Sequence, residues 1–261
     1  ASPSWRRFLV VAVLAAAVLR LAFPGGIAVE HFDEGVYASN HWCPGNPATD
    51  PVHLRHRYPD RHLYAPPLLP SAIEMLMLFV SRGRLVPFLV SLAAGLATVL
   101  LVGEVSRRWF GEPAARATVT LAVFSDVHIL YSRTALTDVT WIAWLLLGVW
   151  LTQAAIAHGR PLVILAAGVA VGLGWWTKYT GWLPLAIGLA GIGGAVVFGR
   201  VGIDRLSGWL LRWLAVAIVA GATISPFVMA LEPHGGYAAV LKHHRGYLTG
   251  IGGWASSLAA Q

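Results

Sequence analysis

Long runs of apolar residues alternate with short polar stretches along most of this 261-residue chain. A transmembrane helix needs about 20 mostly apolar residues to cross the hydrocarbon core of a bilayer. Seven runs reach or approach that length, at residues 8–24, 85–105, 114–132, 135–157, 161–176, 180–198 and 209–231. The pattern therefore predicts an all-α fold, a polytopic bundle of about seven transmembrane helices.

A long first loop, residues 25–84, separates the first two predicted spans. Near its end, residues 67–80 are apolar but too short for a span, and they include Pro70 and Glu74. We expect this segment to form a juxtamembrane helix that lies along the membrane face. The first apolar run is interpreted as a retained helix rather than a cleaved signal peptide, because Arg20 interrupts it and no small-residue cleavage site follows.

Composition supports a membrane protein and excludes an ordinary soluble domain. Hydrophobic residues make up 57% of the chain and charged residues only 12%, whereas about a quarter of the residues in soluble domains are charged. The net charge is +7, but the basic residues are scattered singly, which argues against a nucleic-acid partner. Membrane lipids or a phosphate-bearing substrate fit better. One cysteine, Cys43, allows no internal disulfide.

The basic residues favour one orientation across the membrane, because short cytoplasmic loops are enriched in Lys and Arg. With the N-terminus inside, the inner segments hold nine basic residues against three acidic ones: Arg6, Arg7, Arg107, Arg108, Arg116, Arg160, Arg200, Arg205 and Arg212 against Glu104, Glu112 and Asp204. We therefore expect a multi-pass protein of the plasma (inner) membrane with a cytoplasmic N-terminus. The first loop, residues 131–138 and 175–180, and the tail after Leu231 then share the outer face, where an extracytoplasmic active site can form.

Two acidic features lie near the predicted outer face. Asp33 and Glu34 follow the first span, where a carboxylate can act as a general base or bind a metal beside a lipid-borne substrate. A solvated loop accounts for such a pair equally well. Asp126 lies inside the outer end of its predicted span. Since a carboxylate at that depth is costly unless it meets a polar cavity or a basic partner, we expect Asp126 to face the bundle interior.

Four stretches resemble the GT-C class of polytopic membrane glycosyltransferases, especially its protein mannosyltransferase and aminoarabinose transferase branch (glycosyltransferase family 39). The resemblance covers nearly the whole chain in order and spacing. Its parts are Phe32-Asp33-Glu34-Gly35-Val36-Tyr37-Ala38 with Tyr64-Ala65-Pro66-Pro67-Leu68, then Tyr131-Ser132-Arg133 through Thr137-Asp138, then Gly172-Leu173-Gly174-Trp175-Trp176-Thr177-Lys178-Tyr179-Thr180-Gly181, and finally His243-His244-Arg245-Gly246-Tyr247.

The resemblance implies a role for each group of residues. Asp33 becomes the general base, with Glu34 and Asp138 as the other catalytic candidates. The donor phosphate is expected to meet Arg133, Lys178, His243, His244 and Arg245, since cations stabilise a leaving phosphate. Tyr37, His62 and Tyr64 are expected to support the first loop. Arg133 and Lys178 are also compatible with snorkelling at the interface, and Asp138 with an N-cap.

The resulting hypothesis is a glycosyltransferase that moves a sugar from a polyprenyl-phosphate carrier to a lipid, glycan or protein acceptor outside the membrane, with inversion at the anomeric carbon. No cofactor is certain, and Asp33 and Asp138 leave Mg²⁺ or Mn²⁺ open. A transporter or flippase of a lipid-linked substrate is an alternative, but no repeated halves are visible. An inactive membrane scaffold is another.

Two features depart from the family pattern, and a group of histidines raises the separate question of a zinc site. Ala65 stands where the family has a basic residue or histidine before the Pro-Pro pair, which leaves His62 or Tyr64 as the replacement. His53, His56 and His62 share one loop, but their spacing matches no closed zinc site. The later helices of the family are absent, so we expect residues 1–261 to be the N-terminal catalytic module of a longer protein.

Overall fold

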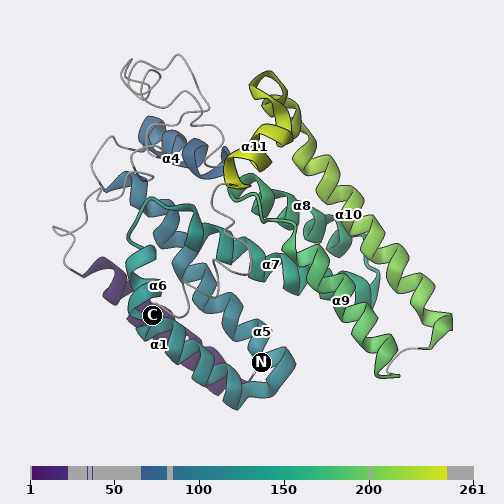
Figure 1. Ribbon diagram of the computed structural model, residues 1–261. Coiled ribbons are helices and arrows are strands. Elements are labelled where there is room, and N and C mark those ends of the chain that lie inside the picture. The colour runs from purple at the N-terminus through teal and green to yellow at the C-terminus, as the bar shows by residue number, and fades with distance from the viewer. Residues whose placement is uncertain are drawn as a thin grey trace, which may run out of the picture.

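The computed structural model describes residues 2–22, 66–80, 85–199 and 202–245, together with Glu34 and Tyr37. Within these residues all regular secondary structure is helical (Figure 1). The elements in chain order are α1 (Pro3–Leu21), α4 (Leu68–Phe79), α5 (Val86–Phe124), α6 (Asp126–Tyr131), α7 (Thr137–His158), α8 (Pro161–Thr177), α9 (Leu183–Val197), α10 (Ile203–Leu231), η3 (Glu232–His234) and α11 (Gly236–Arg245). The predicted all-α bundle is confirmed.

Helix length separates the bundle into two groups. In the part of the chain that the structure describes, three helices are long and apolar enough to cross a membrane: α5, α7 and α10 with η3. The helices α4, α8 and α9 are apolar but shorter. Helix α9 begins only at Leu183 because Gly181 turns against the end of α8, where a Cβ at Gly181 would lie 2.1 Å from the Trp175 amide nitrogen.

The predicted break between residues 105 and 114 is confirmed at Gly111. This residue has φ 84 and ψ 175, which interrupts the helical backbone inside α5, and glycine adopts such a positive φ at little cost. Helix α1 packs against both halves of α5, with Trp5 and Ala16 in one buried cluster with Val99 and Val119. The first span therefore lies between the next two.

The predicted position of Asp126 is wrong. The backbone leaves the helix at Ser125 (ψ 114), and Asp126 begins the new helix α6 rather than lying inside the preceding one. Its side chain is exposed, and Oδ1 accepts a hydrogen bond of 2.7 Å from the Val127 amide. A carboxylate at a helix N-terminus satisfies free amides and interacts well with the helix dipole, so Asp126 needs no partner in the bundle interior.

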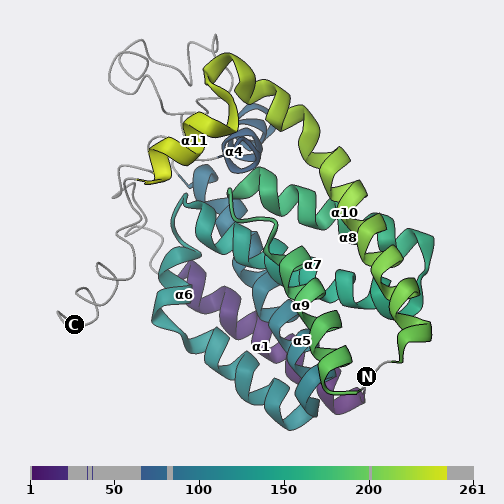
Figure 2. The same cartoon turned by 45° about the vertical axis from the view of Figure 1, so that its right-hand side comes forward.

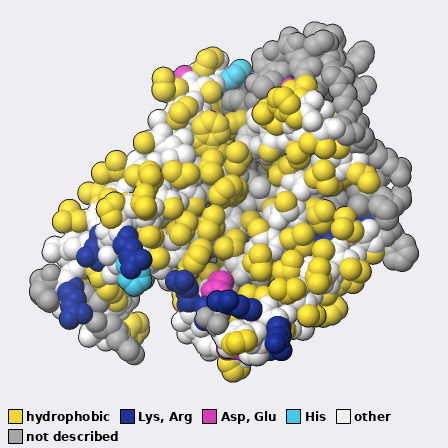
Figure 3. All heavy atoms as spheres, turned by 180° about the vertical axis from the view of Figure 1, so that it is seen from behind, with side chains coloured by type: hydrophobic (Ala, Val, Ile, Leu, Met, Phe, Trp, Pro, Cys, Tyr) yellow, Lys and Arg dark blue, Asp and Glu magenta, His cyan; other side chains and the backbone are white. Residues whose placement is uncertain are grey.

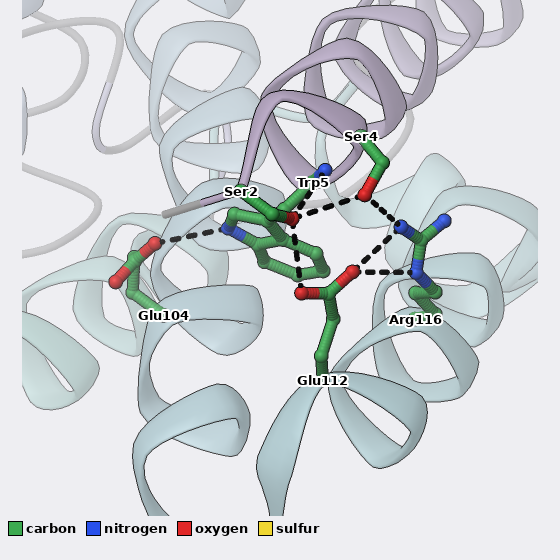
Figure 4. A network of polar contacts seen from close by, with 6 residues as sticks. All are labelled: Ser2, Ser4, Trp5, Glu104, Glu112 and Arg116. Atoms are coloured by element: carbon green, nitrogen blue, oxygen red, sulfur yellow. Dashed lines mark hydrogen bonds and ion pairs between the residues drawn. The ribbon is translucent and has the colours of Figure 1, made fainter.

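A polar network anchors the N-terminus of α1 beside the Gly111 kink (Figure 4). Ser2 caps α1 by accepting from the Trp5 amide (3.1 Å) and donates to Glu112 (3.2 Å). Glu112 also pairs with Arg116 at 2.7 Å, and the Trp5 indole donates to Glu104. Together these contacts satisfy polar groups at one end of the bundle.

Basic side chains gather along one edge of the molecule, next to a broad hydrophobic surface (Figure 3). Exposed arginines occur at the start of α1, beside the α5 kink and between α7 and α8, namely Arg6, Arg7, Arg108 and Arg160. These are segments that the charge pattern assigns to the inner side. The opposite end of the bundle, near α4 and α11, is therefore the end on which the outer-face candidates should converge (Figures 1 and 2).

Helices α8 and α10 pack closely through glycine, which generates a stability prediction. A Cβ on Gly168 would lie 2.4 Å from the Val219 Cβ, whereas nothing lies within 4 Å of a Cβ on Gly191 in α9. We expect Gly168→Ala to lower the free energy of unfolding by about 1–3 kcal/mol through overpacking. Gly191→Ala should leave it unchanged or raise it by up to about 1 kcal/mol. Thermal unfolding in detergent checks this, and equal midpoints for the two variants would contradict it.

Candidate active site beside the turn between α6 and α7

The turn between α6 and α7, Ser132–Leu136, is bound by residues from other segments. Glu34, which is fully buried, accepts a hydrogen bond of 2.8 Å from the Ala135 amide through Oε1. The Ser91 hydroxyl of α5 donates to the Leu136 carbonyl (3.4 Å). Glu34 and Ala135 are 101 positions apart in sequence. Their hydrogen bond therefore joins the first loop to the turn that contains Arg133.

Tyr37 extends this unit toward the juxtamembrane helix. It is buried in a cluster with Leu69 and Ile73 of α4, Phe88 of α5, and Ala135 and Leu136 of the turn. At Tyr37 the first loop therefore packs between α4 and the α6–α7 turn.

Lys178 and Asp138 form an ion pair between the end of α8 and the start of α7. Lys178 Nζ lies 2.7 Å from Asp138 Oδ1, and the two side chains are 38% and 40% exposed. The Lys178 ammonium also lies 5.6 Å from the centroid of the Trp141 ring, a cation–π contact. A ligand can thus reach a lysine whose position is already defined. The N-cap of α7 is Leu136, so the interpretation of Asp138 as an N-cap is wrong.

The histidines of the tail pack on the α8–α9 turn. Tyr179 lies between Tyr237 and His244 of α11, with ring centroids 5.8 Å and 5.4 Å away. His243 stacks edge-on against His244. Burial, assisted by the neighbouring phenols of Tyr237 and Tyr37, raises the pKa of Tyr179 far above its usual value. Deprotonation of the Tyr179 hydroxyl is therefore less favourable than that of an exposed tyrosine.

An apolar cavity of about 370 Å³ opens beside this polar end. Helices α4, α5 and α7 form its walls through Leu68, Leu69, Ala72, Val90, Ala93, Ala94, Ala97, Leu101, Thr140, Ala143, Trp144 and Leu147. Thr140 lies two positions beyond Asp138, and its buried Oγ1 has no hydrogen-bond partner among the described residues. The cavity therefore reaches α7 two positions after Asp138 and continues along α5 and α7.

The structure describes only some of the remaining predicted site residues. Arg133 is half-buried and lines a cavity of about 60 Å³ together with Arg20. Asp33, His62 and Tyr64 lie outside the described residues, as does the side chain of Arg245. The described residues contain no group of three or more His, Cys, Asp or Glu that could hold a metal. With Asp33 outside this set, a metal between Asp33 and Asp138 stays a prediction.

Sequence reasoning missed Arg20 as a site residue. It was interpreted only as an interruption of the first apolar run, yet its side chain is fully buried at the outer end of α1. The cost of placing a charge inside a membrane segment is itself a signal of structural or functional importance. Nothing local in the sequence identifies three of its four partners, which lie more than 100 positions away in α5, α6 and the following turn.

Comparisons with known proteins point to one family. Residues 64–229 match the family described as dolichyl-phosphate-mannose-protein mannosyltransferase. The chain is also similar to "Putative mannosyltransferase YkcB" of Bacillus subtilis (strain 168), with 34% identity over 85 residues. That alignment covers 33% of this chain and 12% of the relative, so the chain spans a small part of the relative's length. No solved structure matches the chain.

The Glu34 contact generates a prediction about the integrity of the site. Glu34→Ala would leave the buried Ala135 amide without its acceptor, and such a loss costs about 1–3 kcal/mol. Glu34→Gln retains an oxygen acceptor and should destabilise the protein less. Thermal unfolding of both variants, with the exposed Glu232→Ala as control, measures the difference. Identical midpoints for Glu34→Ala and Glu232→Ala would show that the bond contributes nothing.

Proposed function

The chain belongs to the dolichyl-phosphate-mannose-protein mannosyltransferase family, and we propose that it transfers a sugar from a polyprenyl-phosphate carrier to an acceptor on the extracytoplasmic side of the inner membrane. The observation that carries this proposal is the Lys178–Asp138 pair, 2.7 Å apart and partly exposed, two positions along α7 from Thr140 in the wall of an apolar cavity. A lipid phosphate needs both a cation and an apolar channel.

The phosphate is the part of the donor that Lys178 would bind. Lys178 is positioned by Asp138 and the Trp141 ring, so little side-chain freedom is lost when a ligand arrives. A phosphate oxygen can share the ammonium with Asp138, because an ammonium carries three donors. Arg133 lies in the α6–α7 turn, five positions before Asp138. Its guanidinium would supply a planar set of donors that suits phosphate.

The lipid chain would occupy the cavity between α4, α5 and α7. All but one of its wall residues are hydrophobic, and several are alanines that leave room for a ligand, namely Ala72, Ala93, Ala94, Ala97 and Ala143. Both α5 and α7 run away from the polar end, so a chain attached to a phosphate at Lys178 would follow them into the bilayer. Burial of apolar chain there contributes roughly 25 cal/mol per Å².

Asp33 is the proposed general base. It directly precedes Glu34 in the sequence, and Glu34 is bonded to the turn that carries Arg133. In the proposed reaction the acceptor hydroxyl oxygen attacks the anomeric carbon while Asp33 takes the hydroxyl proton. The bond between the anomeric carbon and the phosphate oxygen breaks, and polyprenyl phosphate leaves with the electron pair. One displacement of this kind inverts the anomeric centre.

The catalytic role of Asp33 predicts a selective loss of activity. Asp33→Asn removes the proton acceptor and should lower transfer about 100-fold or more without lowering the thermal midpoint. The assay follows radiolabelled mannose from polyprenyl-phosphate mannose into membrane acceptors. Asp126→Asn, an exposed acid, is the matched control and should retain activity. Full activity of Asp33→Asn would exclude the proposed base.

The proposed position of the lipid chain predicts a dependence on its length. Ala97 lies in the cavity wall one helical turn from Leu101 and away from the polar end. Ala97→Phe should therefore lower kcat/KM for a C55 donor about tenfold, since small changes in a hydrophobic pocket alter kcat/KM by about 10- to 200-fold. The kcat/KM for a C10 donor should stay unchanged. The control is Ala166→Phe on the exposed side of α8. An equal effect on both donors would place the chain elsewhere.

A further inference from the structure

Arg20 forms four hydrogen bonds from a fully buried position. Its Nε donates to the Ser132 hydroxyl (3.2 Å) and one terminal nitrogen donates to the Ala16 carbonyl (3.1 Å). The other terminal nitrogen donates to the Ala122 carbonyl (3.2 Å) and to His128 Nδ1. One guanidinium thus joins the end of α1 to the second half of α5, to α6 and to the turn before α7.

Ser132 is the point at which Arg20 reaches the turn. The Ser132 hydroxyl accepts from Arg20 and donates to the His128 carbonyl (2.6 Å), so both of its roles are used. Gly95 of α5 lies against the same hydroxyl, because a Cβ there would lie 2.2 Å from Ser132 Oγ. The serine is therefore held between α1 and α5 with no space to shift.

Every hydrogen-bond partner of the Arg20 guanidinium in the described part of the chain is neutral. Removing a charge from water without an opposite charge is expensive, and the surrounding acceptors offset that cost only in a suitable geometry. A guanidinium presents its donors in a fixed planar fork, which an ammonium cannot reproduce. Lysine at position 20 would keep the charge but lose most of these contacts.

We propose that Arg20 is a positioning residue for donor binding, acting through Ser132 on Arg133. Arg133 follows Ser132 directly, and Arg133 and Arg20 line the same small cavity. A displacement of Ser132 therefore moves the Arg133 backbone. This inference rests on the proposed function, because it takes the donor phosphate as the group that Arg133 binds.

The test measures binding of undecaprenyl phosphate to the purified protein, together with sugar transfer. Arg20→Lys should weaken binding roughly tenfold, the size expected when one hydrogen bond to a charged group is lost. Ser132→Ala and Gly95→Ala disturb the same turn from other sides and should weaken binding in the same direction. Arg7→Lys, an exposed arginine on α1, is the matched control and should bind as the original protein does.

A double-mutant cycle separates positioning from general stability. If Arg20 acts through Arg133, the double variant Arg20→Lys/Arg133→Gln should bind less than about twofold more weakly than Arg133→Gln alone. Losses of affinity that multiply in the double variant would overturn the proposal. Unchanged binding in Arg20→Lys and Ser132→Ala, with only their thermal midpoints lowered, would also overturn it. So would the absence of undecaprenyl phosphate binding to the original protein. Binding with the expected cycle but no sugar transfer would support the role of Arg20 and reject the proposed function instead.

Discussion

The hydrogen bond from the Ala135 amide to the buried carboxylate of Glu34 is the contact on which the outer end of the bundle depends. It joins the first loop to the turn between α6 and α7, and Tyr37 continues the junction by packing on α4 and Leu136. A buried carboxylate needs such donors, because hydrogen bonds offset the cost of removing it from water.

Polar chemistry and apolar packing are separated along the bundle. At the outer end, Lys178 and Asp138 remain partly exposed, so their charges keep access to water and to a ligand. Deeper in the protein, the wall of the large cavity is almost entirely hydrophobic. At the other end, Ser2, Glu112 and Arg116 close the N-terminus of α1 against the α5 kink. The arrangement suits a substrate with a charged head and a long apolar chain.

The sequence predicted the helices better than it predicted the contacts among them. Apolar runs of sufficient length identify membrane helices because the bilayer sets that length. The break at Gly111 fell where the pattern placed it. Asp126 was misplaced because hydropathy alone passed over Ser125, whose side chain caps α6 by accepting from the His128 amide. A serine followed by an acid is a helix-start signal that helps to locate such breaks.

The candidate site was predictable as a set of residues on one face, but not as a geometry. Lys178 and Asp138 were both expected at the outer end, yet their direct pairing depends on how α7 and α8 pack. Arg20 escaped notice because three of its four partners, one backbone carbonyl and two side chains, lie more than 100 positions away. Periodicity reports which face a residue occupies, whereas contacts of this kind depend on tertiary packing.

We propose that one lipid phosphate is bound where the first loop, the α6–α7 turn and the end of α8 meet. An experimental structure with polyprenyl phosphate bound tests this most directly. We expect phosphate oxygens at about 3 Å from Lys178 Nζ, within hydrogen-bonding distance, with the lipid chain between α4, α5 and α7. A phosphate bound at the end of the bundle near the Gly111 kink, with Lys178 still paired only to Asp138, would contradict it.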